Sequence, residues 1–239
     1  MKTLLTLLLL SLISSNVLAA QLTLYGARPF VSLTKGLSPR WDLNVFYAET
    51  VNESNTVFGR QHFVPRDVQS YFQTGLTYKQ SQTINYTAGY VFQRNNPLYP
   101  DFSNENRLWQ QAIVSHRLIT LALSHRFRFE ERFIENRGTK HTDKMATRLR
   151  YQFSFTAALE GKEVDPSEFY LTAYNESYLS LSGQRNALYS ENWTYAGVGY
   201  QTQSLGKLEI GPLVQWAKIN PTGDTRLFYL LQLGWSYTL

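Results

Sequence analysis

The chain has 239 residues, no cysteine and a formal net charge of +5. The lack of cysteine excludes disulfide bonds, thiolate metal sites and a lipid-anchored cysteine near the amino terminus. The basic charge does not predict nucleic-acid binding, because the arginines are spread over many segments and do not form one patch.

The first twenty residues have the order of a secretory signal peptide. Lys2 precedes an apolar run over residues 4–13, and small and polar residues lead to Ala19 and Ala20. The run is too short to cross a bilayer core of roughly 30 Å, and no later apolar stretch is long enough for a transmembrane helix. We therefore predict that residues 1–20 are a signal peptide cleaved after Ala19 or Ala20, and that residues 21–239 form one domain.

Eleven later segments alternate apolar and polar residues with a period of two, which predicts β-strands. The first loses its phase around Pro29, and the last carries Phe228 and Leu230 on its polar side. In chain order the segments are 22–34, 41–51, 69–80, 83–93, 104–118, 121–134, 144–155, 169–181, 191–203, 207–216 and 226–239.

The segment 121–134 shows the two faces most clearly. Phe127 and Phe129 stand on one parity, whereas Arg126 and Arg128 stand on the other. On a helix this order would place charge around the whole circumference, so we predict a strand with one apolar and one charged face.

Strand length distinguishes a soluble sheet from a membrane barrel. Soluble strands are usually about 5–6 residues long, whereas membrane strands need about 9–11, and these segments reach the longer range. Trp41, Trp216, Trp235 and Tyr237 lie near the ends of apolar faces, as in interfacial girdles. The pattern predicts an all-β fold, a transmembrane antiparallel β-barrel of about 10–12 strands in a bacterial outer membrane.

The connections alternate between tight turns and longer loops. Tight turns are predicted at Ser81-Gln82, Ile119-Thr120 and Leu205-Gly206. This alternation predicts short periplasmic turns and longer outer loops, with 156–167 as a long connection on the turn side. The longer loops are 52–67, 94–103, 135–143, 182–190 and 221–224.

Four motifs together resemble an uncharacterised bacterial family catalogued as domain of unknown function 2490. They are ENRLWQQ at 105–111, RFRFEER at 126–132, RLRY at 148–151 and YNE at 174–176. The resemblance extends over residues 69–239 and implies an outer-membrane barrel without a known activity.

Two serine–histidine neighbours, Ser115-His116 and Ser124-His125, raise the question of hydrolysis. With a turn at Ile119-Thr120, paired residue numbers sum to 239, so Ser115 faces Ser124. Both serines then lie on the lumen face and both histidines on the lipid face, beyond the hydrogen-bond reach that a nucleophile and its base need. We predict no catalytic residues.

His62 and His141 fall in predicted outer loops. Two isolated histidines lack the spacing of metal ligands and are expected to be solvated loop residues. We predict no metal site and no cofactor.

The same register predicts ion pairs inside the barrel. It places Arg107 diagonal to Glu130 and Glu105 diagonal to Arg132, within reach of long side chains. The predicted lumen charge network consists of Glu105, Arg107, Arg126, Arg128, Glu130, Arg132, Arg148, Arg150, Glu168 and Glu176.

Such a network would act either as an ion-paired plug or as an anion-selective constriction. Barrels of about eight strands are filled by side chains and open channels appear at about 16–18, which favours the plug. We expect a monomeric, non-enzymatic outer-membrane barrel that serves envelope structure or narrow solute passage. Its partners would be outer-membrane lipid, lipopolysaccharide and the barrel-assembly machinery, with no nucleic acid. The alternative is an enzyme acting on lipid or lipopolysaccharide at a loop or rim site.

Overall fold

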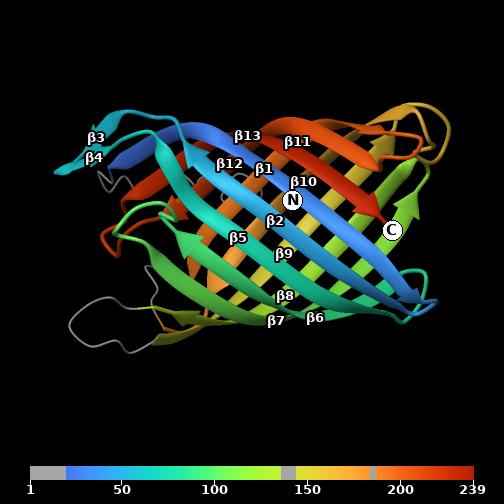
Figure 1. Ribbon diagram of the computed structural model, residues 1–239, viewed down its shortest axis with the longest axis horizontal. Coiled ribbons are helices and arrows are strands. Elements are labelled where there is room, and N and C mark those ends of the chain that lie inside the picture. The colour runs from blue at the N-terminus through green and yellow to red at the C-terminus, as the bar shows by residue number, and fades with distance from the viewer. Residues whose placement is uncertain (1–19, 136–143, 184–186) are drawn as a thin grey trace, which may run out of the picture.

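The computed structural model describes residues 20–135, 144–183 and 187–239, in which eleven long strands close into one barrel (Figure 1). This confirms the predicted all-β fold and a strand count within the predicted range. Within these residues no helix is long and apolar enough to cross a membrane. The barrel strands are β1 (Gln21–Ser38), β2 (Trp41–Asn52), β5 (Arg66–Lys79), β6 (Ile84–Asn95), β7 (Ser103–Leu118), β8 (Leu121–Ile134), β9 (Lys144–Ala158), β10 (Glu168–Ser180), β11 (Tyr189–Gln201), β12 (Lys207–Lys218) and β13 (Thr225–Thr238).

The barrel closes through a parallel pair, β1 with β13, whereas all its other neighbouring strands are antiparallel. In an odd-numbered barrel of strands that alternate in direction, the first and last strands must run the same way. The pairing extends from Gln21 opposite Thr225 to Thr34 opposite Thr238. The expectation of an antiparallel barrel is therefore corrected at this seam, where β1 spans the full wall despite the phase change at Pro29.

The two ends of the barrel differ. One end, the loop end, carries connections 53–65, 96–102, 181–188 and 219–224, and a hairpin of β3 (Thr56–Phe58) and β4 (Gln61–Phe63) protrudes there (Figure 1). The other, the turn end, carries 39–40, 80–83, 119–120, 159–167 and 202–206. The predicted turn at Ile119-Thr120 is confirmed, with Ile119 at φ 57°. Residues 1–19 and most of the predicted loop 135–143 lie outside the described residues.

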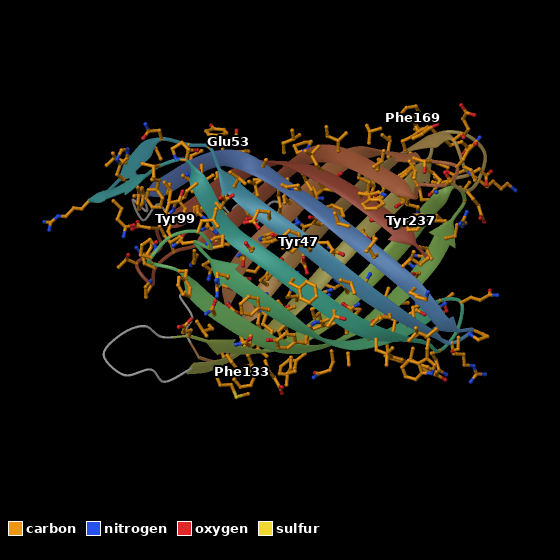
Figure 2. The ribbon with its side chains drawn as sticks, viewed as in Figure 1. Tyr47, Glu53, Tyr99, Phe133, Phe169 and Tyr237 are labelled. Atoms are coloured by element: carbon orange, nitrogen blue, oxygen red, sulfur yellow. The ribbon has the colours of Figure 1, made fainter. Side chains whose placement is uncertain are left out.

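Alternation along the strands separates the outer face from the lumen. Phe127 is 52 % exposed, whereas the next residue, Arg128, is 4 % exposed. Figure 2 shows Phe133 and Phe169 projecting outward from the wall. The predicted pairing of β7 with β8 is confirmed at every position, including Ser115 opposite Ser124.

One wall of the lumen is apolar. Phe228 and Leu230, which break the alternation of the last strand, are buried against Leu22, Leu24 and Leu213. Phe58 and Phe63 of the β3–β4 hairpin pack against the same cluster. Burial of this surface holds the hairpin to the loop end of the barrel.

On another wall, two glycines make room for a large ring. Gly75 and Gly89 face each other across β5 and β6. A Cβ atom at these positions would stand 2.8 Å and 2.6 Å from the indole ring of Trp109. The buried ring in turn lies 4.1 Å from the guanidinium carbon of Arg128, so the glycines help to position a charged side chain.

The parallel seam is testable by crosslinking, because the chain has no native cysteine. Tyr25 and Tyr229 are paired, with ring centroids 5.5 Å apart. The double variant Tyr25→Cys, Tyr229→Cys is expected to form a disulfide, visible as a shifted band on a non-reducing gel. A disulfide needs Cα atoms about 4.4–6.8 Å apart, and residues paired on neighbouring strands meet this requirement.

The matched control is Tyr25→Cys with Trp235→Cys. Trp235 pairs with Val31, six residues further along the seam, which separates the thiols by about 20 Å. Crosslinking in the control but not in the first pair would contradict the parallel register.

Candidate functional site

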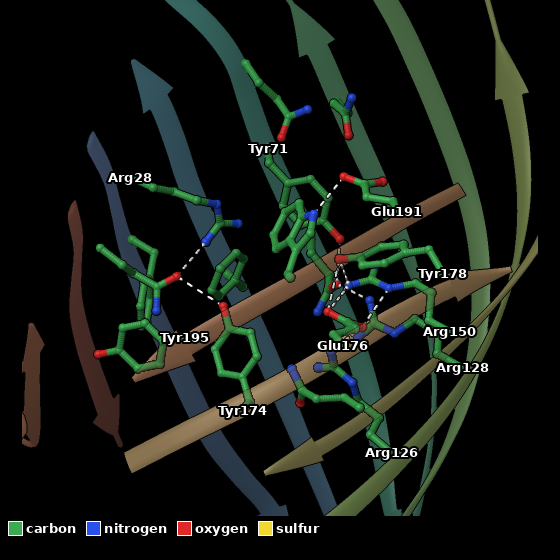
Figure 3. Close-up of a pocket in the computed structure, with 18 of the residues that line it drawn as sticks. Arg28, Tyr71, Arg126, Arg128, Arg150, Tyr174, Glu176, Tyr178, Glu191 and Tyr195 are labelled. Carbon is green, nitrogen blue, oxygen red and sulfur yellow. Dashed lines mark hydrogen bonds and ion pairs between the residues drawn. The ribbon is translucent and has the colours of Figure 1, made fainter. Parts of the chain in front are cut away.

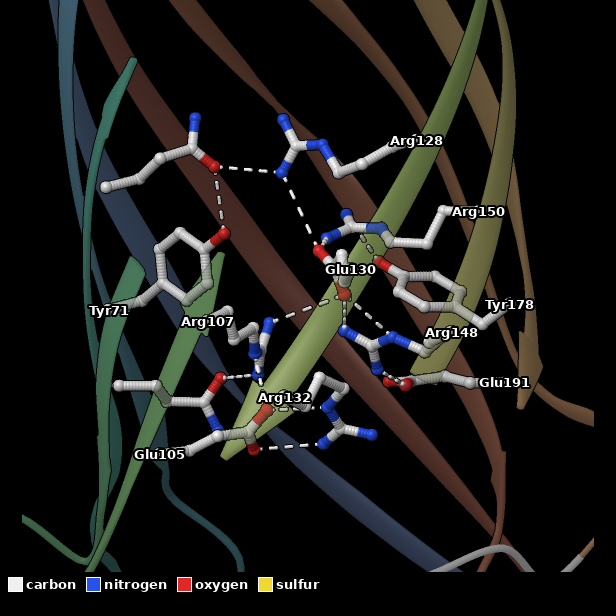
Figure 4. A network of polar contacts seen from close by, with 12 residues as sticks. Tyr71, Glu105, Arg107, Arg128, Glu130, Arg132, Arg148, Arg150, Tyr178 and Glu191 are labelled. Carbon is white, nitrogen blue, oxygen red and sulfur yellow. Dashed lines mark hydrogen bonds and ion pairs between the residues drawn. The ribbon is translucent and has the colours of Figure 1, made fainter. Parts of the chain in front are cut away.

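The centre of the lumen is a carboxylate surrounded by arginines (Figure 4). Glu130 of β8 is fully buried, at 0 % exposure. Its Oε2 accepts from Arg148 Nη2 at 2.6 Å, and its Oε1 accepts from Arg150 Nη1 at 2.7 Å. Arg128 and Arg107 approach the same carboxylate at 3.8 Å and 4.0 Å. The surrounding cations offset the desolvation of the buried carboxylate.

Glu176 of β10 forms the second buried centre. Arg150 binds it in two-pronged fashion, with Nε to Oε1 at 2.8 Å and Nη2 to Oε2 at 2.9 Å. Arg126 donates to Oε1 at 2.8 Å, and the Tyr178 hydroxyl donates to Oε2 at 3.0 Å. Arg150 therefore bridges both buried carboxylates in a geometry suited to its planar fork.

Glu105 of β7 forms the third centre, nearer the loop end. Arg132 binds it at 2.5 Å and 2.9 Å, and Arg107 Nε donates to Oε1 at 2.5 Å. Arg107 also donates to Gln93. The structure thus contains both diagonal contacts expected from the β7–β8 register, one close and one at the limit of ion pairing.

Every predicted network residue except Glu168 lies in this cluster. Glu168 starts β10 at the turn end, and its Oε2 accepts a hydrogen bond from the backbone of Asp165. It shares the face of Glu176 but lies eight residues, about 26 Å, further along the strand.

The cluster also holds residues that the sequence did not single out. Arg148 approaches Glu191 of β11 at 3.6 Å. Arg28 of β1 hydrogen-bonds Gln232 of β13 at 3.4 Å. Arg226 of β13 lies on the polar face that the alternation predicts, but the sequence predicts no strand pairing that would bring it to the network.

Aromatic rings support several of these guanidinium groups. Arg148 and Arg150 lie 4.8 Å and 4.6 Å from the ring of Tyr178. Arg28 lies 5.2 Å from the ring of Trp193. Ring faces attract cations, so these contacts partly replace missing carboxylates.

Two adjoining cavities reach the network. The first, about 420 Å³, is lined by eight arginines and three glutamates (Figure 3). The second, about 560 Å³, lies toward the loop end between Phe63 of the hairpin and Phe228. Both are lined by Glu191, Trp193 and Arg226, so they lie next to each other.

In both serine–histidine neighbours, the serine and the histidine lie on opposite faces of the sheet, as the register predicts. On the outer face, His116 stacks on His125 at 5.3 Å, and His125 Nδ1 lies 2.9 Å from the Tyr151 hydroxyl. His62 contacts Asn55 at 2.6 Å, and His141 lies outside the described residues. In the described part of the chain, no group of three or more His, Cys, Asp or Glu could hold a metal ion.

Comparison with known proteins gives one match. Residues 30–226 match the family described as "Protein of unknown function (DUF2490)", a range that begins within β1 and includes the whole network. Neither the curated proteins nor the solved structures contain a match. The resemblance drawn from the four sequence motifs is confirmed.

Proposed function

The chain belongs to the DUF2490 family of proteins of unknown function, and within that family we propose that it is a non-enzymatic outer-membrane barrel with a largely occluded lumen. The observation that carries this proposal is the inversion of the two faces. Large apolar side chains such as Phe127, Leu231 and Ile210 are 47–52 % exposed on the outer face, whereas Glu130 is fully buried inside. Lipid suits the outer face, since soluble proteins rarely expose such extensive apolar surface.

In this proposal residues 1–20 are the export signal and residues 21–239 form the barrel. The loop end would face outward and the turn end the periplasm, as the asymmetry of such barrels requires. Trp41 at the turn end of β2 and Trp235 near that of β13 suit the interfacial girdle. The partners would be outer-membrane lipid, lipopolysaccharide and the assembly machinery, with the protein as a monomer.

The buried ion pairs support a plug. Glu105, Glu130 and Glu176 are each at most 3 % exposed, and their arginines reach inward from β7, β8 and β9. These ion-paired side chains occupy much of the lumen and leave at most a narrow solute path, so the role would be envelope structure or narrow passage. Among the described residues, no arrangement of side chains favours the alternative of a lipid-modifying enzyme.

The location is tested by fractionating cells that express the full chain. We expect the protein in the outer-membrane fraction, extracted only by detergent, with a gel mobility that changes on heating. Recovery from the soluble periplasm would contradict the proposal.

The outer face is tested by placing a charge on it. Phe127→Arg is expected to impair insertion or to destabilise the barrel, since arginine at mid-bilayer costs about 2–4 kcal/mol in such proteins. Gln152→Ala, on the lumen face, should have a much smaller effect. The measurement is the urea midpoint of folding into lipid vesicles, and equal midpoints for the two variants would overturn the assignment of faces.

A further inference from the structure

The lumen carries more positive than negative charge. Eight arginines and three glutamates line the inner cavity. Glu105 and Glu130, buried behind the arginines, raise the carboxylates from three to five, which leaves an excess of three positive charges. A buried excess of this kind favours an anionic guest, because isolated charges away from water are costly.

Two of these three surplus charges lie on Arg28 and Arg226. Among the described residues, no carboxylate lies within 4.0 Å of Arg28 or Arg226. Arg28 is only 7 % exposed, its hydrogen bond to Gln232 is long, and its Nε has no partner. The Nε atoms of Arg226 and Arg126 are also buried without partners. These side chains line one cavity and are under-bonded there.

Flat apolar surfaces lie beside these cations. Arg28 is 5.2 Å from the ring of Trp193 and 5.9 Å from that of Phe46. The rings of Tyr174 and Tyr195 are 5.2 Å apart, and the Tyr174 hydroxyl shares the Gln232 oxygen with Arg28. Figure 3 shows Arg28 and Arg126 extending into the cavity from different walls, with Tyr174 between them. Ring faces next to guanidinium groups suit a ligand with a planar body and an oxyanion head.

We propose that the inner cavity binds a small organic anion, a carboxylate or phosphate ester on a planar body, which enters from the loop end. Arg28 would bind the oxyanion, and Trp193 and Tyr174 would contact the body. Arg226 lies six residues, about 20 Å, nearer the loop end along the seam and would attract the anion on its way in. The route would be the adjoining cavity beneath the hairpin, where Arg226 lines both spaces. This goes beyond the proposed function, because a barrel plugged at Glu130 still has room for a ligand beside the plug.

The test uses the full mature chain folded in detergent micelles and phenyl phosphate as the probe. We expect isothermal titration calorimetry to show saturable binding to the wild type, weaker binding of inorganic phosphate and no binding of phenol. Arg28→Gln should weaken phenyl phosphate binding at least tenfold, and Arg226→Gln should weaken it less, because Arg226 lies on the route and does not contact the bound oxyanion. The matched control is Arg117→Gln, whose arginine pairs with Glu163 at the turn end, away from both cavities, and should leave binding unchanged.

Folding of each variant is checked by heat-modifiable gel mobility, and binding is compared only among folded variants. If Arg28→Gln does not fold, Arg226→Gln alone decides. Absence of binding by the wild type, or equal binding by the wild type and a folded lumen variant, would overturn the proposed site. Either result would leave the membrane location untouched, since that depends on cell fractionation.

Discussion

Replacing Glu130 with glutamine is expected to lower the free energy of unfolding by about 3–5 kcal/mol, because the loss of a buried charge partner strands the opposite charges. The carboxylate is fully buried and lies within 4.0 Å of four arginines. Glutamine preserves size and shape but removes the charge, so Arg148 and Arg150 would lose their closest shared counter-ion. The measurement is the urea midpoint of the protein in lipid vesicles.

The matched control is Glu131→Gln. Glu131 follows Glu130 on β8, and the strand alternation directs it to the outer face. We expect this variant to unfold close to the wild-type midpoint. Equal midpoints for the two glutamine variants would show that water reaches Glu130, which contradicts a dry, ion-paired lumen.

Patterns within short stretches of sequence predicted most of the strands that form the barrel wall. A period of two located the strands, and one tight turn at Ile119-Thr120 fixed the whole β7–β8 register. Closure was harder to predict, because the pairing of β1 with β13 joins residues some 200 positions apart and no turn sets it. Bacterial barrels usually have an even number of strands, so the eleven alternating segments alone did not indicate an eleven-stranded barrel.

The sequence predicted the part of the site whose residues lie on neighbouring strands joined by a tight turn. The links among Glu105, Arg107 and Arg132 follow from the hairpin register alone. The alternation shows which face of the strand a residue lies on, but not how far along the barrel it lies. For this reason Glu168, which lies at the turn end, was wrongly included in the charge network. Arg28 and Arg226 were not recognised as part of the site, because they enter it only after β1 and β13 close the barrel.

The apolar wall of the lumen also forms only when β1 and β13 close the barrel. Phe228 and Leu230 are apolar residues at positions where the alternation of the last strand predicts polar ones, and the sequence does not indicate what they contact. Closure places them beside Leu22 and Leu24 of β1, where all four are buried. A break in the sequence pattern therefore marked the seam, although the pattern alone did not show what fills it.

Arg150→Ala distinguishes a plug from a water-filled channel. Arg150 donates to Glu130 at 2.7 Å and to Glu176 at 2.8 Å and 2.9 Å, so its loss weakens the pairing of both carboxylates. In a dry plug this should cost about 3–5 kcal/mol, seen as conversion to the unfolded gel band at lower temperature. In a hydrated channel the carboxylates stay solvated, stability changes little, and the preference for anions falls instead.

Both quantities are measured on the same preparation, as unfolding temperature and as ion selectivity in planar bilayers. Arg117→Ala is the control, because Arg117 pairs with the exposed Glu163 at the turn end, where such a bridge contributes about 0–1 kcal/mol. We expect Arg150→Ala to unfold well below both the control and the wild type. The wild type should conduct poorly, since the ion pairs of Arg150 with Glu130 and Glu176 narrow the lumen. An unchanged unfolding temperature together with a large loss of anion selectivity would refute the plug, because only a solvated lumen tolerates the loss of Arg150 without unfolding earlier.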